Sequence, residues 1–221
     1  IRSGFVPTPV SLRRTLLSDP IRLGYHGSVR VATRIVRAAG RQDDDVVLRQ
    51  YDVIDPFAML RAGELDIMIV KFVLREPDLA CSAALGTDER AAVMGAHHPL
   101  AGRASVSIED LADFEAFRCP GKMPDYVWDE VVPHRTPLGR PIRRRHDVTT
   151  AAAMMDVVSR TDAVHLSLIS LADIAPPTVR VVPIHDLPGA PVALAWREGD
   201  VPAAALELVR DAERATAGSR A

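Results

Sequence analysis

Residues 55–70 read DPFAMLRAGELDIMIV, and this stretch predicts a helix, a turn and a buried strand in succession. Asp55 is a suitable N-cap, and Pro56 suits the first helical turn, where an N–H group would have no partner. Gly63 can adopt the left-handed conformation that ends a helix. The apolar run that follows predicts a strand from Leu65 onward that is covered on both faces, as in a parallel sheet between helices.

Alternating strand and helix patterns continue before this stretch. Residues 21–25 and 46–51 predict strands. Residues 28–39, between them, predict an amphipathic helix that Ser28 caps and Gly40 ends. The order strand, helix, strand, helix, strand is typical of doubly wound layers with right-handed crossovers, so we expect an α/β fold.

A second alternating set follows. Ser107 and Asp110 have the spacing of a capping box, and Asp200 is the expected N-cap of a last helix that packs back on the first set. The pattern predicts strands around residues 79–85, 90–94, 116–119, 142–148, 163–168, 179–184 and 192–196, and helices around residues 108–113, 125–132 and 150–159.

The repeated pattern predicts two similar lobes that close on a ligand by a hinge motion. We assign residues 21–88 and 191–217 to lobe I and residues 89–190 to lobe II. Residues 1–20 have the composition of a linker or tail. Because the first residue is Ile rather than Met, we expect the chain to be a fragment of a longer product.

Composition narrows the class of protein. The 221 residues are 48% hydrophobic and 25% charged, which is typical of globular proteins. The net charge of −2 gives no overall attraction to nucleic acid or anionic membranes. Cys81 and Cys119 make no disulfide framework, and neither a secretory signal nor a membrane-spanning run is present, so we expect a cytoplasmic location.

Several segments, in their order and spacing, resemble the effector-binding domain of LysR-type transcriptional regulators. These segments are IRLGYHGS (21–28), RAGELDIMIV (61–70), AAVMGAHHPLAG (91–102), SIEDLADF (107–114), SRTDAVHLSLISLA (159–172) and VALAWREG (192–199). The resemblance covers about residues 21–215. It departs from the family at residues 164–167, where related sequences often have a glycine-rich or threonine-proline stretch.

The resemblance implies two Rossmann-like lobes of periplasmic-binding-protein type II architecture, with a ligand cleft between them. It implies that a small, anionic effector binds in this cleft and that lobe closure alters the oligomer and its DNA-binding state. It also implies a homodimer or homotetramer, no cofactor, and DNA contact only through a winged helix-turn-helix that is absent from this chain. Residues 29–39 and 156–160 are the expected subunit contacts.

Strand ends indicate where the effector should bind, because ligands of open α/β sheets lie beyond the carboxyl ends of strands, near helix amino termini. The candidate effector-binding residues are His26, Gly27, Ser28, Lys71, Phe72, Pro120, Gly121, Lys122, Thr149, Thr150, His165 and Ser167. Together they would form a polar, anion-accepting cleft. The serine and threonines can also be plain helix caps, the lysines solvated surface groups, and the histidines polar packing residues.

Other conspicuous residues favour structural roles. Asp66 is expected to make salt-bridge or backbone contacts at the start of its strand. Side chains alternate along residues 143–145, so these three arginines cannot all face a nucleic acid. His97 and His98 lack carboxylate or thiol neighbours for a metal. An enzyme with Asp66 or His165 as a base, or a solute-binding protein, stays an alternative on a similar two-lobed scaffold.

Overall fold

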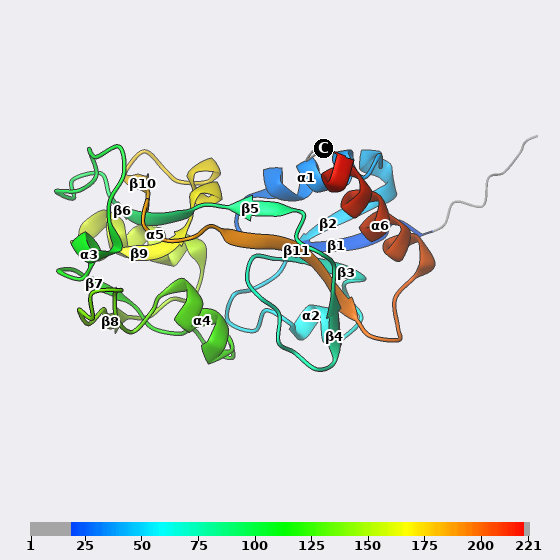
Figure 1. Ribbon diagram of the computed structural model, residues 1–221, viewed down its shortest axis with the longest axis horizontal. Helices are drawn as coiled ribbons and strands as arrows, with labels where there is room; N and C mark the ends of the chain where they lie inside the picture. Colours follow the sequence, from blue (N-terminus) through cyan, green and yellow to red (C-terminus); the bar gives the residue numbers. More distant parts are fainter. Residues whose placement is uncertain (1–18, 219–221) are drawn as a thin grey trace, which may run out of the picture.

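The computed structural model of the chain describes residues 19–218 and places a six-stranded sheet and a three-stranded sheet side by side along its long axis (Figure 1). The linker or tail predicted for residues 1–20 lies almost entirely outside the described residues. We call the six-stranded sheet with its helices the first half, and the remainder the second half. The first half contains α1 (Val29–Ala38), α2 (Ala58–Arg61) and α6 (Ala203–Gly218); the second contains α3 (Ile108–Leu111), α4 (Asp125–Val131) and α5 (Ala151–Arg160).

The sheet of the first half has the order β2-β1-β3-β11-β4, and β5 also pairs with β11. Its strands are β1 (Ile21–Tyr25), β2 (Val46–Gln50), β3 (Ile67–Val70), β4 (Leu79–Cys81), β5 (Gly86–Asp88) and β11 (Ala190–Arg197). The strands β1, β2 and β3 are parallel, as expected, whereas β11 runs antiparallel to its neighbours. A short 3-10 helix, Asp43–Asp45, precedes β2.

The strand predicted within residues 55–70 is confirmed as β3, which is buried along its whole length. Gly63 has a φ of 71° and ends the helix before it. The N-cap prediction for Asp55 is wrong: α2 is one turn that starts after Phe57, and the Asp55 carboxylate instead accepts a hydrogen bond from Lys122 in the second half.

Asp66 has the structural role predicted for it. Its carboxylate accepts hydrogen bonds from the backbone N–H of Arg22 (2.7 Å) and from the Arg22 guanidinium. Burial alone would raise the pKa of Asp66, but these hydrogen bonds outweigh it and hold the pKa below its ordinary value. The contact fixes β1 beside the start of β3, which begins at Ile67 rather than at the predicted Leu65.

Helices cover both faces of the first sheet because side chains alternate along its strands. Ile67 and Ile69 pack with α1 and α6, whereas Met68 and Val70 pack with α2. The closure of the last helix on the first half is thus confirmed. Its predicted cap is wrong, since α6 starts at Ala203 and Asp200 pairs with Arg197.

The second half has a different strand arrangement from the one expected. Its strands are β6 (Arg90–Gly95), β7 (Glu115–Phe117), β8 (Arg143–His146), β9 (His165–Leu168) and β10 (Val179–Pro183), with the 3-10 helix η2 (Ile169–Asp173) after β9. The sequence pattern predicted a second parallel βα set, but β10, β6 and β9 form an antiparallel sheet and only the separate pair β7–β8 is parallel. The capping box at Ser107 is confirmed.

The chain crosses between the halves in two neighbouring places. Asp88 at the end of β5 pairs with Ala190 at the start of β11, so one crossing lies beside the other. Both strands continue along the sheet of the first half (Figure 1). Within residues 19–218, no helix is long and apolar enough to cross a membrane.

Candidate functional site

A cavity of about 120 Å³ lies between the halves, where β1, β2 and β3 end and where α4, α5, β9 and η2 face them. An apolar cavity of about 150 Å³ accommodates benzene, so this one suits a ligand of roughly one six-membered ring. Its apolar wall consists of Tyr51, Val53, Pro56, Phe72, Met123, Val127, Trp128, Val131, Val148, Ala151, Met154, Leu168 and Leu171. Its polar side chains are His26, Lys71, Thr150, His165, Ser167 and Ser170.

His26 follows β1 and lines the cavity beside Tyr51. The Nδ1 atom of His26 lies 3.3 Å from the Tyr51 carbonyl oxygen. A carbonyl can only accept, so Nδ1 carries the proton and Nε2 of the neutral ring has a lone pair. Burial lowers the pKa of His26, although the hydrogen bond to Tyr51 opposes that shift. The Tyr51 hydroxyl donates to the Ile69 carbonyl (2.8 Å) and so holds this wall against β3.

Gly27 lets the second half approach the first. Its φ of 73° lies in the left-handed region, which side chains with a Cβ adopt at a cost. A Cβ at this position would also lie 3.2 Å from Leu171 of η2. Glycine therefore suits both the turn after β1 and the close contact with η2.

Lys71 and Phe72 follow β3. The Lys71 ammonium donates to the Asp88 carboxylate (2.9 Å) and to the Ser170 hydroxyl (2.8 Å). Asp88 is buried and also accepts a hydrogen bond from the backbone N–H of Ser170 (3.2 Å). Lys71 thus joins β3 to the crossover and to η2, and its charge is compensated before any ligand enters. Phe72 makes an edge-to-face contact with Phe57.

His165 is a deeply buried histidine in the cavity wall. It is 7% exposed, and within residues 19–218 its Nδ1 atom has no hydrogen-bond partner. Its ring packs near those of Phe117 and Trp128, with centroids 5.2 and 5.8 Å away. Burial and then the nearby His26 lower the pKa of His165 to about 3, so the imidazole is neutral at physiological pH.

Thr150 brings the amino end of α5 to the cavity. Its hydroxyl accepts a hydrogen bond from the backbone N–H of Ala153 (3.1 Å), which makes it the N-cap. Thr150 is exposed to solvent and also lines the cavity, so the cavity opens beside it. Ser167 on β9 also lines the cavity, as do the predicted residues described above.

The other predicted residues lie around the cavity rather than in its wall. Ser28 caps α1 and donates to Asp173, and Thr149 is exposed next to Thr150. The segment of Pro120, Gly121 and Lys122 contacts the first half: the backbone N–H of Lys122 donates to the Ile54 carbonyl (2.6 Å), and its ammonium donates to Asp55 (2.8 Å).

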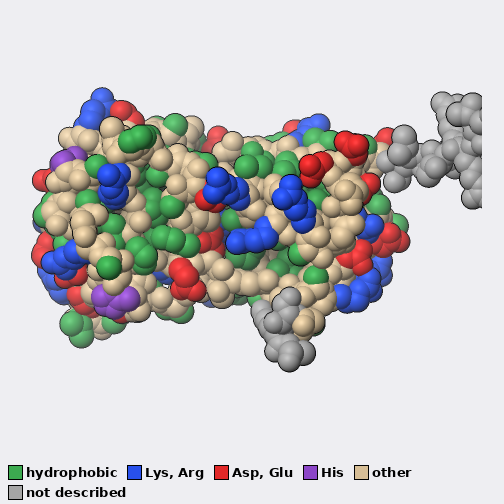
Figure 2. Space-filling view, turned by 90° about the horizontal axis from the view of Figure 1, so that it is seen from above, with side chains coloured by type: hydrophobic (Ala, Val, Ile, Leu, Met, Phe, Trp, Pro, Cys, Tyr) green, Lys and Arg blue, Asp and Glu red, His purple; other side chains and the backbone are tan. Residues whose placement is uncertain are grey.

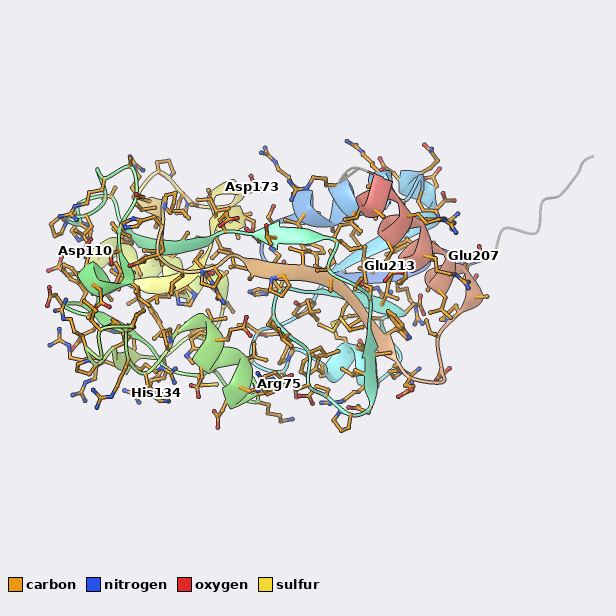
Figure 3. The ribbon with its side chains drawn as sticks, viewed as in Figure 1. Arg75, Asp110, His134, Asp173, Glu207 and Glu213 are labelled. Carbon is orange, nitrogen blue, oxygen red and sulfur yellow. The ribbon has the colours of Figure 1, made fainter. Side chains whose placement is uncertain are left out.

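Polar contacts join the halves on two sides of the cavity. On one side, Asp173 of η2 accepts hydrogen bonds from Ser28 and Arg30. On the other, the Tyr126 hydroxyl of α4 donates to Glu76 and accepts from the backbone N–H of Arg75. Figure 3 labels Asp173 and Arg75, which lie on opposite sides of the molecule in this view. These contacts hold the halves together around the cavity.

Sequence reasoning missed Tyr51, Asp88, Trp128 and Ser170. Tyr51 follows β2, so the strand-end rule that selected the residues after β1 and β3 could have found it. Asp88 and Ser170 are short polar residues at the ends of apolar segments, and no spacing rule links them to Lys71. Trp128 lies on the buried side of a predicted helix, which favours a core role on sequence grounds.

Asp66 and His165, the two residues considered as bases of an enzyme, lie apart in the structure. Asp66 is held by Arg22 and does not line the cavity, so it is not beside His165. Within residues 19–218, no group of three histidine, cysteine or acidic side chains could hold a metal ion. The described part of the chain therefore offers a cavity that His165 lines and Asp66 does not.

Comparison with protein families gives one match. The family model described as the LysR substrate binding domain matches residues 17–217, which is nearly the whole chain. A search of curated proteins returns no match to this sequence.

Solved structures share the fold at low sequence identity. Full-length CbnR complexed with its target DNA has a TM-score of 0.70 and 18% identity, and the match covers 89% of this chain and 70% of that chain. The BenM effector binding domain with its effector benzoate has a TM-score of 0.67 and 18% identity, covering 91% and 93%. The effector binding domain of QuiR in complex with shikimate has a TM-score of 0.67 and 19% identity, covering 90% and 97%.

Proposed function

Since this chain belongs to the family of LysR substrate binding domains, we propose that its cavity binds the small-molecule effector of a LysR-type transcriptional regulator. The observation that carries the proposal is the cavity itself. It lies where the parallel strands end and between two halves that polar contacts hold together.

The effector fits one six-membered ring with a single acid group. The volume of about 120 Å³ sets the size, and the apolar wall around Trp128 and Met154 favours a ring over a chain of polar groups. Benzoate and shikimate, which the BenM and QuiR structures contain, are both carboxylates of one ring. The candidate contacts are His26, Gly27, Lys71, Phe72, Thr150, His165 and Ser167.

The two halves act as the lobes of the sensor. We take residues 21–88 and 191–217 as lobe I and residues 89–190 as lobe II, with the hinge at the crossings beside Asp88 and Ala190. An effector that contacts both lobes favours their closed arrangement by its differential affinity, without covalent chemistry. The contacts of Asp173 and Tyr126 form or break with closure, which couples the cavity to the outer surface.

In the intact regulator, lobe closure alters a homodimer or homotetramer that works in the cytoplasm. The helix α1 and residues 156–160 are the proposed subunit contacts. DNA is bound by a winged helix-turn-helix outside the residues described. Figure 2 shows a face that carries both basic and acidic side chains, with several basic ones near its middle.

A thermal-shift panel of benzoate, shikimate and their uncharged amides tests the proposal. At a hundredfold excess over its dissociation constant, a ligand that binds here raises the melting temperature by about 5 to 10 °C. Ala151→Phe fills the cavity and abolishes the shift, because Ala151 lines the cavity. Ala152→Phe, at the exposed neighbouring position of the same helix, keeps it. A shift that survives Ala151→Phe places the ligand elsewhere and removes the proposal.

A further inference from the structure

The part of the cavity wall that residues 19–218 form holds one lysine, Lys71, and its charge is already paired. Among the residues of 19–218 that line the cavity, Lys71 is the only lysine or arginine. Its ammonium lies 2.9 Å from the carboxylate of Asp88, whose side chain is buried. A carboxylate that enters the cavity therefore meets no uncompensated positive side chain, although burial in an apolar wall makes its charge costly.

Because the charge of Lys71 is compensated, the hydrogen bonding of His26 determines how an acid can bind in the cavity. Its Nδ1 proton is used by the Tyr51 carbonyl, so Nε2 of the neutral ring is an acceptor. An acceptor cannot bind a carboxylate oxygen, but it can bind an acid O–H, or it can take up a proton and become a donor. The hydroxyls of Thr150 and Ser167 and the amino end of α5 offer neutral donors and a partial charge only.

We propose that an acid effector binds in this cavity together with one proton, which it shares with Nε2 of His26. This inference rests on the proposed function. One proton comes from solvent and forms an N–H bond on the imidazole or an O–H bond on the acid. The bound pair is thus either a carboxylate with an imidazolium or an acid with a neutral imidazole, and the effector and the protein form no covalent bond with each other. The site thereby selects acids whose affinity rises as the pH falls.

The charged groups around His26 bear on the same proton. Lys71 disfavours a second positive charge on the ring, whereas Asp52 favours it. The Tyr51 carbonyl accepts from Nδ1 in either charge state. His165, which faces His26 in the wall, lies deeper and remains neutral. The imidazole of His26 is therefore the one that takes part in proton transfer.

Titration calorimetry of the chain with benzoate tests this, at about pH 6 and about pH 8 and in two buffers of different protonation enthalpy. We expect uptake of close to one proton and an affinity at least tenfold higher at the lower pH. Benzyl alcohol donates a hydrogen bond from its hydroxyl to neutral His26, so we expect it to bind with equal affinity at the two pH values. In His26→Gln the amide donates without a proton, so benzoate binds equally at both pH values. His134→Gln, an exposed histidine that does not line the cavity, keeps the wild-type dependence.

The outcomes separate this inference from the proposed function. Benzoate affinity that is independent of pH in the wild type, or pH dependence that persists in His26→Gln, overturns the shared proton. So does binding of benzyl alcohol without binding of benzoate. If neither compound binds at either pH, the one-ring cavity site fails and the inference with it. Should His26→Gln not fold, Asp88→Asn is the second variant: it frees the charge of Lys71, and we expect benzoate binding to lose its pH dependence.

Discussion

Ser28 and Asp173 join the two halves, because the Ser28 hydroxyl donates a hydrogen bond to the Asp173 carboxylate at a distance of 2.5 Å. The same hydroxyl accepts the backbone N–H of Arg30 and caps α1. Ser28 is 1% exposed, so this hydroxyl is withdrawn from water. One side chain thus stabilises a helix and the contact between the two halves.

Ser28→Ala removes both interactions. We expect the free energy of unfolding, measured with urea, to fall by roughly 1–2 kcal/mol. The affinity for a ligand from the thermal-shift panel also falls, because the closed arrangement is weakened. Ser107→Ala is a matched control: Ser107 caps α3 and donates to Asp186, but does not line the cavity. A similar loss of ligand affinity in both variants would argue against a role of Ser28 in closure.

Gly121→Ala disturbs the contact between residues 120–122 of the second half and Ile54 of the first half. Its Cβ would lie 2.7 Å from the Ile54 carbonyl oxygen, which accepts the N–H of Lys122. We expect a loss of roughly 2–4 kcal/mol in urea unfolding, from left-handed strain and overpacking together. Gly139→Ala has the strain without the clash and should cost about 1 kcal/mol. Equal losses would show that Ile54 does not constrain this segment.

Asp66→Asn tests the contact between β1 and β3. The pKa of Asp66 is lowered in the folded state, so its contribution to stability is present above its ordinary pKa of about 3.9 and is lost as the pH falls through the lowered value. At neutral pH we expect a loss of roughly 1–3 kcal/mol, which shrinks in acid. Asp200→Asn, at an exposed pair, should change stability by less than about 0.5 kcal/mol. A loss for Asp66→Asn that is constant with pH would contradict this account.

His165→Leu tests the buried neutral imidazole. The folded pKa is about 3, below the unfolded value, so the unfolded state binds the extra proton between about pH 6.5 and pH 3. Wild-type stability therefore falls with decreasing pH in this window, by up to about 1.4 kcal/mol per pH unit for this group. Urea unfolding of His165→Leu across the window should show a shallower slope, whereas exposed His134→Leu should not. Identical slopes for wild type and His165→Leu would mean that His165 is not buried and neutral.

Local sequence patterns were sufficient for most of the first half. The buried strand β3, the cap at Ser28 and the turn at Gly63 depend on residues close in sequence, which periodicity and capping rules describe. The cap at Asp55 failed because a long-range partner, Lys122, holds that carboxylate. The antiparallel sheet of the second half could not be predicted, since periodicity gives no information on which strands pair.

The candidate site was predictable to the extent that it lies at strand ends. His26, Lys71 and Phe72 follow β1 and β3 and line the cavity. The mainly apolar wall was not foreseen, because Trp128 and Met154 come from helices whose buried sides are typical of core packing. The pairing of Lys71 with Asp88 is a tertiary contact, and it compensates the charge of the lysine that was expected to attract an anion.

The most direct test of the central claim is a proton–nitrogen NMR titration of the two tryptophan indoles with the strongest ligand of the thermal-shift panel. Trp128 lines the cavity and its indole N–H donates to the Phe117 carbonyl (3.2 Å), whereas Trp196 packs against the core of the first half and does not line the cavity. We predict that the Trp128 signal shifts and saturates with the ligand while the Trp196 signal stays in place. A ligand that stabilises the protein and leaves the Trp128 signal unmoved would contradict the claim that this cavity is the effector site.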